Sequence, residues 1–79
     1  MMFTVEPGCG SADTHRHHGE EFIYILSGKL QTTLNYNNIY ILKKGDSMYF
    51  KSFEYHSWTN TGKAKVNLLW VHSPIEPNR

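Results

Sequence analysis

Hydrophobic and polar residues alternate in short runs along this chain, and glycine, asparagine, aspartate or serine separates one run from the next. The stretch KLQTTLNY (29–36) places Leu30, Thr32 and Leu34 on one side and polar residues on the other, as a half-buried strand does. No segment keeps the 3.6-residue period of an amphipathic helix. The pattern therefore predicts a protein built from strands.

Seven stretches carry this strand pattern and are rich in β-branched and aromatic residues. The turns KKGD (43–46) and Asn37-Asn38 are expected between them, because asparagine and glycine tolerate positive φ. Near-regular spacing of short strands predicts an all-β sandwich or barrel that forms one domain over residues 1–79. The seven predicted strands are MFTVE (2–6), EFIYILSG (21–28), KLQTTLNY (29–36), IYIL (39–42), SMYF (47–50), YHSWTN (55–60) and AKVNLLWV (64–71).

The composition and charge of the chain argue against some classes of function. The 79 residues suffice for one small core, and the net charge is +1 with lysines and arginines scattered along the chain. No basic stripe is available to neutralise phosphates, so we expect no direct contact with nucleic acid. No apolar run reaches membrane-spanning length, no signal peptide is apparent, and Cys9 is the single cysteine. These features predict a cytoplasmic protein that does not contact a membrane.

The stretch THRHHGEEF (14–22) concentrates three of the five histidines of the chain. On a strand, His15 and His17 would project from the same face, and Glu21 follows a turn at Gly19. With the distant His56, these side chains could meet inside a barrel and bind a first-row divalent metal such as iron, manganese, nickel or zinc. The alternative is an ordinary solvated, charged loop.

Two motifs carry a resemblance to a known family. His15-x-His17-x3-Glu21-x6-Gly28 resembles the first cupin motif, and Gly45-x5-Lys51-x-Phe53-x2-His56-x3-Asn60 resembles the second. The resemblance implies a cupin-type jelly-roll β-barrel of six to eight strands. It also implies that His15, His17, Glu21 and His56 are metal ligands. The alternative is a vestigial, metal-free pocket, because sensor cupins can keep the pocket and lose the metal. Lys51 and Phe53 stand where the family usually has proline and glycine, which alters a turn near the fourth ligand.

The residues between the proposed ligands resemble one group of cupins more closely. GEEFIYILSG (19–28) and GDSMYFKS (45–52) are similar to the cupin domain that follows a helix-turn-helix domain in many bacterial transcriptional regulators. This resemblance implies a ligand-sensing domain. No helix-turn-helix is present among the 79 residues, so the chain is either a free-standing small cupin or the sensor part of a longer protein.

Other polar residues of the two motif regions have simpler interpretations. His18 and Glu20 alternate away from the face of the proposed ligands and are expected in solvent. His72, at the end of the last strand, is expected to be structural or exposed. Tyr49 and Trp58, close to the second motif, are candidates for the wall of a small-molecule pocket.

Most large apolar side chains must fill the core of so small a domain. Phe22, Tyr24 and Leu26, however, alternate to the other side of their strand from the proposed metal ligand Glu21. A second sheet or a second subunit must cover that row. A homodimer is therefore the expected partner arrangement.

Two functions are the main hypotheses, and a structural or storage barrel with no specific ligand is the least expected, because potential ligands are so concentrated. The first is a module that binds a divalent metal and a small-molecule ligand without turnover. It would be the ligand-sensing domain of a transcriptional regulator. The second is a small metal-dependent enzyme, such as a dioxygenase, isomerase or decarboxylase, acting on a small polar substrate. The first is favoured because Tyr24, Tyr49, Glu54 and Tyr55, the spare acid–base groups, are not strongly placed.

Overall fold

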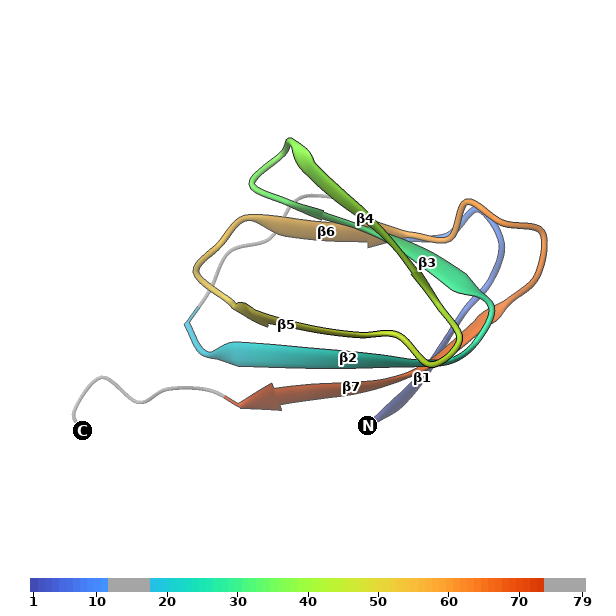
Figure 1. The fold of residues 1–79 in the computed structure, drawn as a ribbon, viewed down its shortest axis with the longest axis horizontal. Coiled ribbons are helices and arrows are strands. Elements are labelled where there is room, and N and C mark those ends of the chain that lie inside the picture. The colour runs from blue at the N-terminus through green and yellow to red at the C-terminus, as the bar shows by residue number, and fades with distance from the viewer. Residues whose placement is uncertain (12–17, 74–79) are drawn as a thin grey trace.

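The computed structural model describes residues 1–11 and 18–73, which form seven β-strands and no helix (Figure 1). Nothing in these two ranges is a helix long and apolar enough to cross a membrane. Each predicted strand is confirmed, with boundaries shifted by one or two residues at most of the ends. The strands are β1 (Met2–Val5), β2 (Glu20–Ser27), β3 (Lys29–Leu34), β4 (Asn38–Lys43), β5 (Ser47–Lys51), β6 (His56–Thr59) and β7 (Val66–Ser73).

The strands form two antiparallel sheets that lie face to face (Figure 1). One sheet has four strands in the order β1-β7-β2-β5, and the other has three in the order β4-β3-β6. Consecutive strands often belong to different sheets, so the chain repeatedly crosses between the layers. This arrangement confirms the all-β prediction.

The core lies between the sheets and follows the predicted alternation. On β2, Ile23 and Ile25 are buried, whereas Phe22 and Tyr24 on the opposite face are exposed. On β3, Leu30 and its alternate neighbours are buried, as the sequence pattern predicted. The buried hydrophobic side chains are Val5, Ile23, Ile25, Leu30, Leu34, Leu42, Phe50, Val66 and Leu68. Trp58 and Trp70 are partly buried and pack against this cluster.

Gly28 makes the crossing from β2 to β3 possible. It is the single residue between the two strands, with φ at +81°, a value that side chains other than glycine rarely adopt. A Cβ there would also lie 2.7 Å from the carbonyl oxygen of Lys65. The glycine that closes the first motif is therefore required by backbone geometry.

The turn between β3 and β4 differs from the expectation. The predicted turn at Asn37-Asn38 is confirmed at Asn37 and wrong at Asn38, because Asn38 already pairs with Leu34 and the turn consists of residues 35–37. Asn35 and Tyr36 take positive φ values of 51° and 67°. Asparagine tolerates this conformation. Tyr36 was expected at the end of the strand 29–36. In the turn, its ring instead packs against Tyr55 at a centroid distance of 5.3 Å.

The outer face of the four-stranded sheet carries apolar side chains in register. Phe22 of β2 is paired with Val71 of β7 on one side and with Tyr49 of β5 on the other. All three side chains are more than a third exposed. In the described part of the chain, then, this row is open to solvent, and the expected homodimer remains a prediction.

Asn60, the last residue of the second motif, joins three segments by hydrogen bonds. Its side chain is 1% exposed. The amide nitrogen donates to the carbonyl oxygens of Val5 (3.0 Å) and Ala64 (2.9 Å), and the amide oxygen accepts from the backbone N–H of Gly62 (2.9 Å). This side chain thus ties the end of β1 to the loop that leads into β7.

Asn60→Asp is expected to lower the free energy of unfolding by about 2–4 kcal/mol, because a carboxylate cannot donate to the two carbonyl groups. Urea unfolding followed by circular dichroism measures the change. Asn37→Asp, in the exposed turn, is the matched control and should change the free energy by less than about 0.5 kcal/mol. Equal effects of the two substitutions would contradict the role assigned to Asn60.

Candidate metal and ligand site

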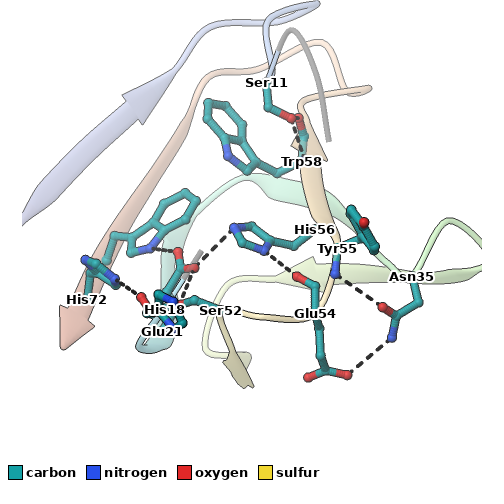
Figure 2. Close-up of polar contacts among 11 residues, drawn as sticks. Ser11, His18, Glu21, Asn35, Ser52, Glu54, Tyr55, His56, Trp58 and His72 are labelled. Carbon is teal, nitrogen blue, oxygen red and sulfur yellow. Dashed lines mark hydrogen bonds and ion pairs between the residues drawn. The ribbon is translucent and has the colours of Figure 1, made fainter. Parts of the chain in front are cut away.

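Two of the predicted metal ligands meet between the sheets. Glu21 lies on the inner face of β2, and His56 begins β6 in the opposite sheet. Each side chain is 4% exposed. The Nε2 atom of His56 lies 3.2 Å from Oε2 of Glu21 (Figure 2). Residues 35 positions apart in sequence are thus brought into contact by the packing of the two layers.

Local structure fixes the orientation of the His56 ring. Its Nδ1 lies 2.8 Å from the carbonyl oxygen of Glu54, and the ring packs against Phe50 at a centroid distance of 4.9 Å. A carbonyl oxygen can only accept, so Nδ1 carries a hydrogen and donates it. In the neutral imidazole, Nε2 then presents a lone pair toward Glu21.

The contact between His56 and Glu21 therefore requires a proton or a cation between the two atoms. A neutral imidazole nitrogen and a carboxylate oxygen are both acceptors and repel one another at 3.2 Å. Either a proton on this pair or a metal cation relieves the repulsion. An imidazole nitrogen and a carboxylate oxygen are also the donor atoms that first-row divalent metals bind.

Two further donors hold the Glu21 carboxylate. The indole Nε1–H of Trp70 donates to Oε1 at 2.8 Å. The hydroxyl of Ser52 donates to Oε2 at 2.9 Å (Figure 2). Ser52 is fully buried in the turn after β5. These bonds explain how a carboxylate can remain buried, since a buried charge needs hydrogen-bond partners.

Sequence reasoning missed both donors. Trp70 falls among the large apolar side chains that are expected to fill the core, and Ser52 lies at the end of GDSMYFKS (45–52) with no predicted role in the site. The alternation along β7 contained a signal for Trp70, which pairs with Ile23, two residues from Glu21 on the same face of the sheet. The signal for Ser52 is weaker, because only the three-dimensional turn brings residue 52 to β2.

The turn around Ser52 forms without the proline and glycine usual in the family. The backbone N–H of Glu54 donates to the carbonyl oxygen of Lys51 at 3.0 Å and closes the turn. The N–H of Ser52 donates to the carbonyl oxygen of Gly19 at 2.9 Å. Lys51 and Phe53 point into solvent, so their side chains do not alter the buried group.

The other two predicted ligands, His15 and His17, lie outside the described residues. Within residues 1–11 and 18–73, no group of three or more histidine, cysteine, aspartate or glutamate side chains could hold a metal ion. The structure therefore brings together Glu21 and His56 of the four. The complete ligand set remains a prediction.

His18 and His72 lie near this site but on the exposed side. Both side chains are exposed, and Nε2 of His72 lies 3.4 Å from the carbonyl oxygen of His18 (Figure 2). His72 pairs with Glu21 in the register of β7 and β2. The expectation that His18 is in solvent and that His72 is exposed is confirmed.

A cavity of about 620 Å³ lies beside Glu21. Aromatic rings form much of its wall, with Trp70 packed edge-to-face against Phe3 (5.8 Å) and Trp58 (5.7 Å). The predicted pocket residue Trp58 therefore lines a cavity next to the carboxylate. Binding of a ligand there remains a prediction. The described residues around the cavity are Met1, Phe3, Thr4, Val5, Glu21, Trp58, Trp70, Val71 and His72.

Tyr49, the other predicted pocket residue, lies on the opposite face of the sheet. It is 56% exposed, and its hydroxyl donates a hydrogen bond to Glu20. This bond raises the pKa of the Tyr49 phenol above its ordinary value, because the phenol in its protonated form is the donor. Proximity in sequence to the second motif was misleading here, since strand alternation turns Phe50 inward and Tyr49 outward.

Known proteins are similar to this chain in sequence or in fold. The family profile described as Cupin domain matches residues 1–72. The HTH-type transcriptional regulator PuuR of Escherichia coli (strain K12) is 31% identical over 75 residues, covering 94% of this chain and 40% of the regulator. The chain thus spans less than half the length of that relative.

Solved structures agree with this match. A predicted oxalate decarboxylase from Thermotoga maritima has a TM-score of 0.81 and 32% identity, covering 94% of this chain and 64% of that one. The Cupin_2 domain of an XRE family transcriptional regulator from Enterobacter cloacae has a TM-score of 0.81 and 17% identity, covering 95% and 79%. The second likeness concerns the fold alone. Together these structures confirm the expected cupin-type jelly roll.

Replacing Glu21 tests whether its carboxylate is a structural acceptor. In chelator-treated protein, Glu21→Ala is expected to lower the free energy of unfolding by about 2–4 kcal/mol, because the indole of Trp70 and the hydroxyl of Ser52 lose their acceptor. Glu21→Gln keeps an acceptor oxygen and supplies an N–H toward His56, so it should cost no more than about 1 kcal/mol. Urea unfolding measures both, with the exposed Glu6→Ala as control. An alanine variant as stable as that control would contradict this assignment.

Proposed function

The chain belongs to the cupin domain family, and from this premise we propose that it binds a divalent metal ion through His15, His17, Glu21 and His56. A small molecule binds beside the ion in the adjacent cavity. The domain works as the ligand-sensing part of a transcriptional regulator. One observation carries the proposal: Nε2 of His56 and Oε2 of Glu21 face each other at 3.2 Å inside the protein.

The residues around this contact suit a metal ion. Glu21 supplies one oxygen, and His56 supplies one nitrogen with its ring already oriented by the carbonyl of Glu54. His15 and His17 would complete a set of three nitrogens and one oxygen, which suits iron, manganese, nickel or zinc. When bound, such an ion supplies a Lewis-acidic point with coordination positions left for a ligand. The rings of Trp58 and Trp70 then offer an apolar surface for the body of that ligand.

The regulatory role is supported by the relatives and by the chemistry of the cavity. The chain is 31% identical over 75 residues to an HTH-type transcriptional regulator, of which the match covers 40%. The described residues contribute two titratable side chains to the cavity wall, Glu21 and His72. Glu21 contacts Trp70, Ser52 and His56. His72 is therefore the candidate acid–base group. Tyr24, Tyr49, Glu54 and Tyr55 are absent from the described wall. A binding module needs none of them.

The alternative is a small metal-dependent enzyme. It is supported by the 32% identity to a predicted oxalate decarboxylase and by the exposed imidazole of His72 on the cavity wall. Oxygen-uptake and decarboxylation assays on small carboxylic acids separate the two functions. Substrate-dependent turnover that His72→Gln abolishes would replace the sensor by the enzyme.

Titration of chelator-treated protein with Mn²⁺ tests the metal site. We expect one ion per chain by isothermal titration calorimetry. His56→Gln, His15→Gln and Glu21→Gln should each weaken binding by more than about 100-fold, because a ligand to the metal contributes more than the outer contacts that give 10–100-fold. His18→Gln is the matched control and should leave the affinity within about twofold. Absence of binding, or binding that His56→Gln does not weaken, would overturn the proposal.

We also propose that a second copy of the chain covers the outer face of the four-stranded sheet. The row Val71–Phe22–Tyr49 crosses three strands there and is continued by Tyr24 on β2. Exposed apolar rows of this kind mark interfaces between subunits, and a two-fold axis would make the row self-complementary.

Sedimentation velocity tests the dimer. The unaltered chain is expected to sediment as a dimer, and Phe22→Glu is expected to give a monomer, because it places charge in the middle of the apolar row. Phe53→Glu, an exposed position in the turn after β5, is the matched control and should remain dimeric. A monomeric unaltered chain would refute this arrangement without affecting the metal site.

A further inference from the structure

Four lysines gather around a second cavity, at the end of the sandwich away from the contact between Glu21 and His56. This cavity has a volume of about 380 Å³. The connections β2–β3, β4–β5 and β6–β7 lie together at this end of the molecule and form the described wall (Figure 1). Among the wall residues are Lys29, Lys43, Lys44 and Lys63, with Gly28 and Gly62. Lysines that are scattered along the sequence are thus close together in the fold.

The wall of this cavity concentrates the positive charge of the chain. The protein has eight lysines and arginines, and four of them line this one cavity. No described aspartate or glutamate is among the wall residues. Asp46 is the acidic residue nearest to Lys44 in the sequence, and its carboxylate accepts from the backbone N–H of Lys43 at 2.8 Å. Even if Asp46 offsets one of the four charges, the cavity stays positive in a chain whose net charge is only +1.

Two of these lysines lie directly opposite one another on neighbouring strands. Lys29 begins β3 and pairs in register with Lys43, the last residue of β4. Like charges that are directly opposed destabilise a pair of strands, because their side chains leave the sheet on the same face. An anion bound between the two ammonium groups would replace this repulsion by attraction.

Hydrogen bonds to β2 fix the turn that carries Lys43 and Lys44. The backbone N–H of Gly45 donates to the carbonyl oxygen of Ile25 at 2.9 Å. The N–H of Ile25 donates in return to the carbonyl oxygen of Asp46 at 3.0 Å. This turn is therefore held in place by a strand of the other sheet.

The β6–β7 connection is fixed by Asn60 and contacts Lys29. The buried side-chain oxygen of Asn60 accepts from the backbone N–H of Gly62 at 2.9 Å. The stem of Lys29 passes close to this glycine, since a Cβ added at Gly62 would lie 3.5 Å from Cε of Lys29. A ligand thus meets backbone segments that are already ordered, which lowers the entropic cost of binding.

We propose that this lysine pocket, lined by Lys29, Lys43, Lys44 and Lys63, binds a small molecule through a phosphate or diphosphate group. Ammonium groups donate charge-assisted hydrogen bonds to phosphate oxygens, and a group with several negative charges suits several lysines. The volume of about 380 Å³ lies within the range of small-molecule pockets. The four lysines surround one cavity and form no stripe along which a nucleic-acid backbone could lie. The proposal goes beyond the proposed function, because it involves neither the metal ligands nor the aromatic cavity.

Titration with inorganic pyrophosphate, after removal of metal and chelator, tests the lysine pocket. We expect a dissociation constant below about 1 mM at low ionic strength. In two-dimensional NMR spectra, the backbone amides around the pocket should shift most. Lys43→Gln and Lys63→Gln should each weaken binding by about 3–5-fold, the size expected for one exposed ion pair. Lys51→Gln is the matched control, since Lys51 is exposed at the far end of β5, and it should leave the affinity within about 1.5-fold.

Urea unfolding gives a second test, which depends on the opposed lysines. Without the anion, Lys43→Gln is expected to raise the urea midpoint, because it removes the repulsion with Lys29. Saturating pyrophosphate should then raise the midpoint of the unaltered chain more than that of this variant, since the unaltered chain binds the anion more tightly. Lys51→Gln should gain as much from the anion as the unaltered chain does.

Three results would overturn the lysine pocket. One is an absence of pyrophosphate binding up to about 10 mM. Another is equal binding by Lys63→Gln and Lys51→Gln. The third is a short DNA duplex that binds in a manner dependent on Lys63 while pyrophosphate does not, which would assign these lysines to a nucleic-acid backbone instead. None of these results bears on the proposed metal site.

Discussion

A carboxylate can remain inside a protein only where donors or cations surround it, and the site depends on how this chain meets that constraint at Glu21. The side chain is 4% exposed, and among the described residues it contacts an indole N–H, a hydroxyl and an imidazole. Those groups come from β7, from the turn after β5 and from β6. One side chain of β2 thus organises elements of both sheets.

The antiparallel sandwich makes this convergence possible. Strand alternation turns Glu21, Ile23 and Ile25 to the same face of β2, so the polar group continues a row of core side chains. At one end of the row the layers enclose aliphatic side chains. At the other end they enclose Glu21 and His56, and the aromatic cavity begins beside them. The polar group is therefore at the boundary between the packed core and the open end of the barrel.

Much of the fold was predictable because it depends on local regularities. Alternation along each strand gave the inner and outer faces, and glycines marked sharp changes of direction such as the crossing at Gly28. The errors arose where a tertiary contact overrides a local preference. Tyr36 adopts a positive φ in the turn, where it packs on Tyr55, although its sequence context favoured a strand.

The site was predictable only in part. Motif spacing grouped Glu21 and His56 with His15 and His17, and the structure places Glu21 and His56 in contact. Trp70 and Ser52 could not be assigned from spacing, because their role depends on which strands become neighbours and on the direction of a single N–H or O–H bond. Tyr49 was misplaced for the same reason: closeness along the chain does not determine the face of a sheet.

Glu21 and His56 belong to different sheets, and this affects the lifetime of the protein. An ion shared by the two layers would act as a removable cross-link, since the unfolded chain holds no preformed site for it. Binding to the folded state alone shifts the folding equilibrium by mass action. In a cell that lacks the ion, a larger fraction of the molecules would be unfolded and accessible to proteases. The abundance of the protein would then follow metal supply, even with its synthesis unchanged.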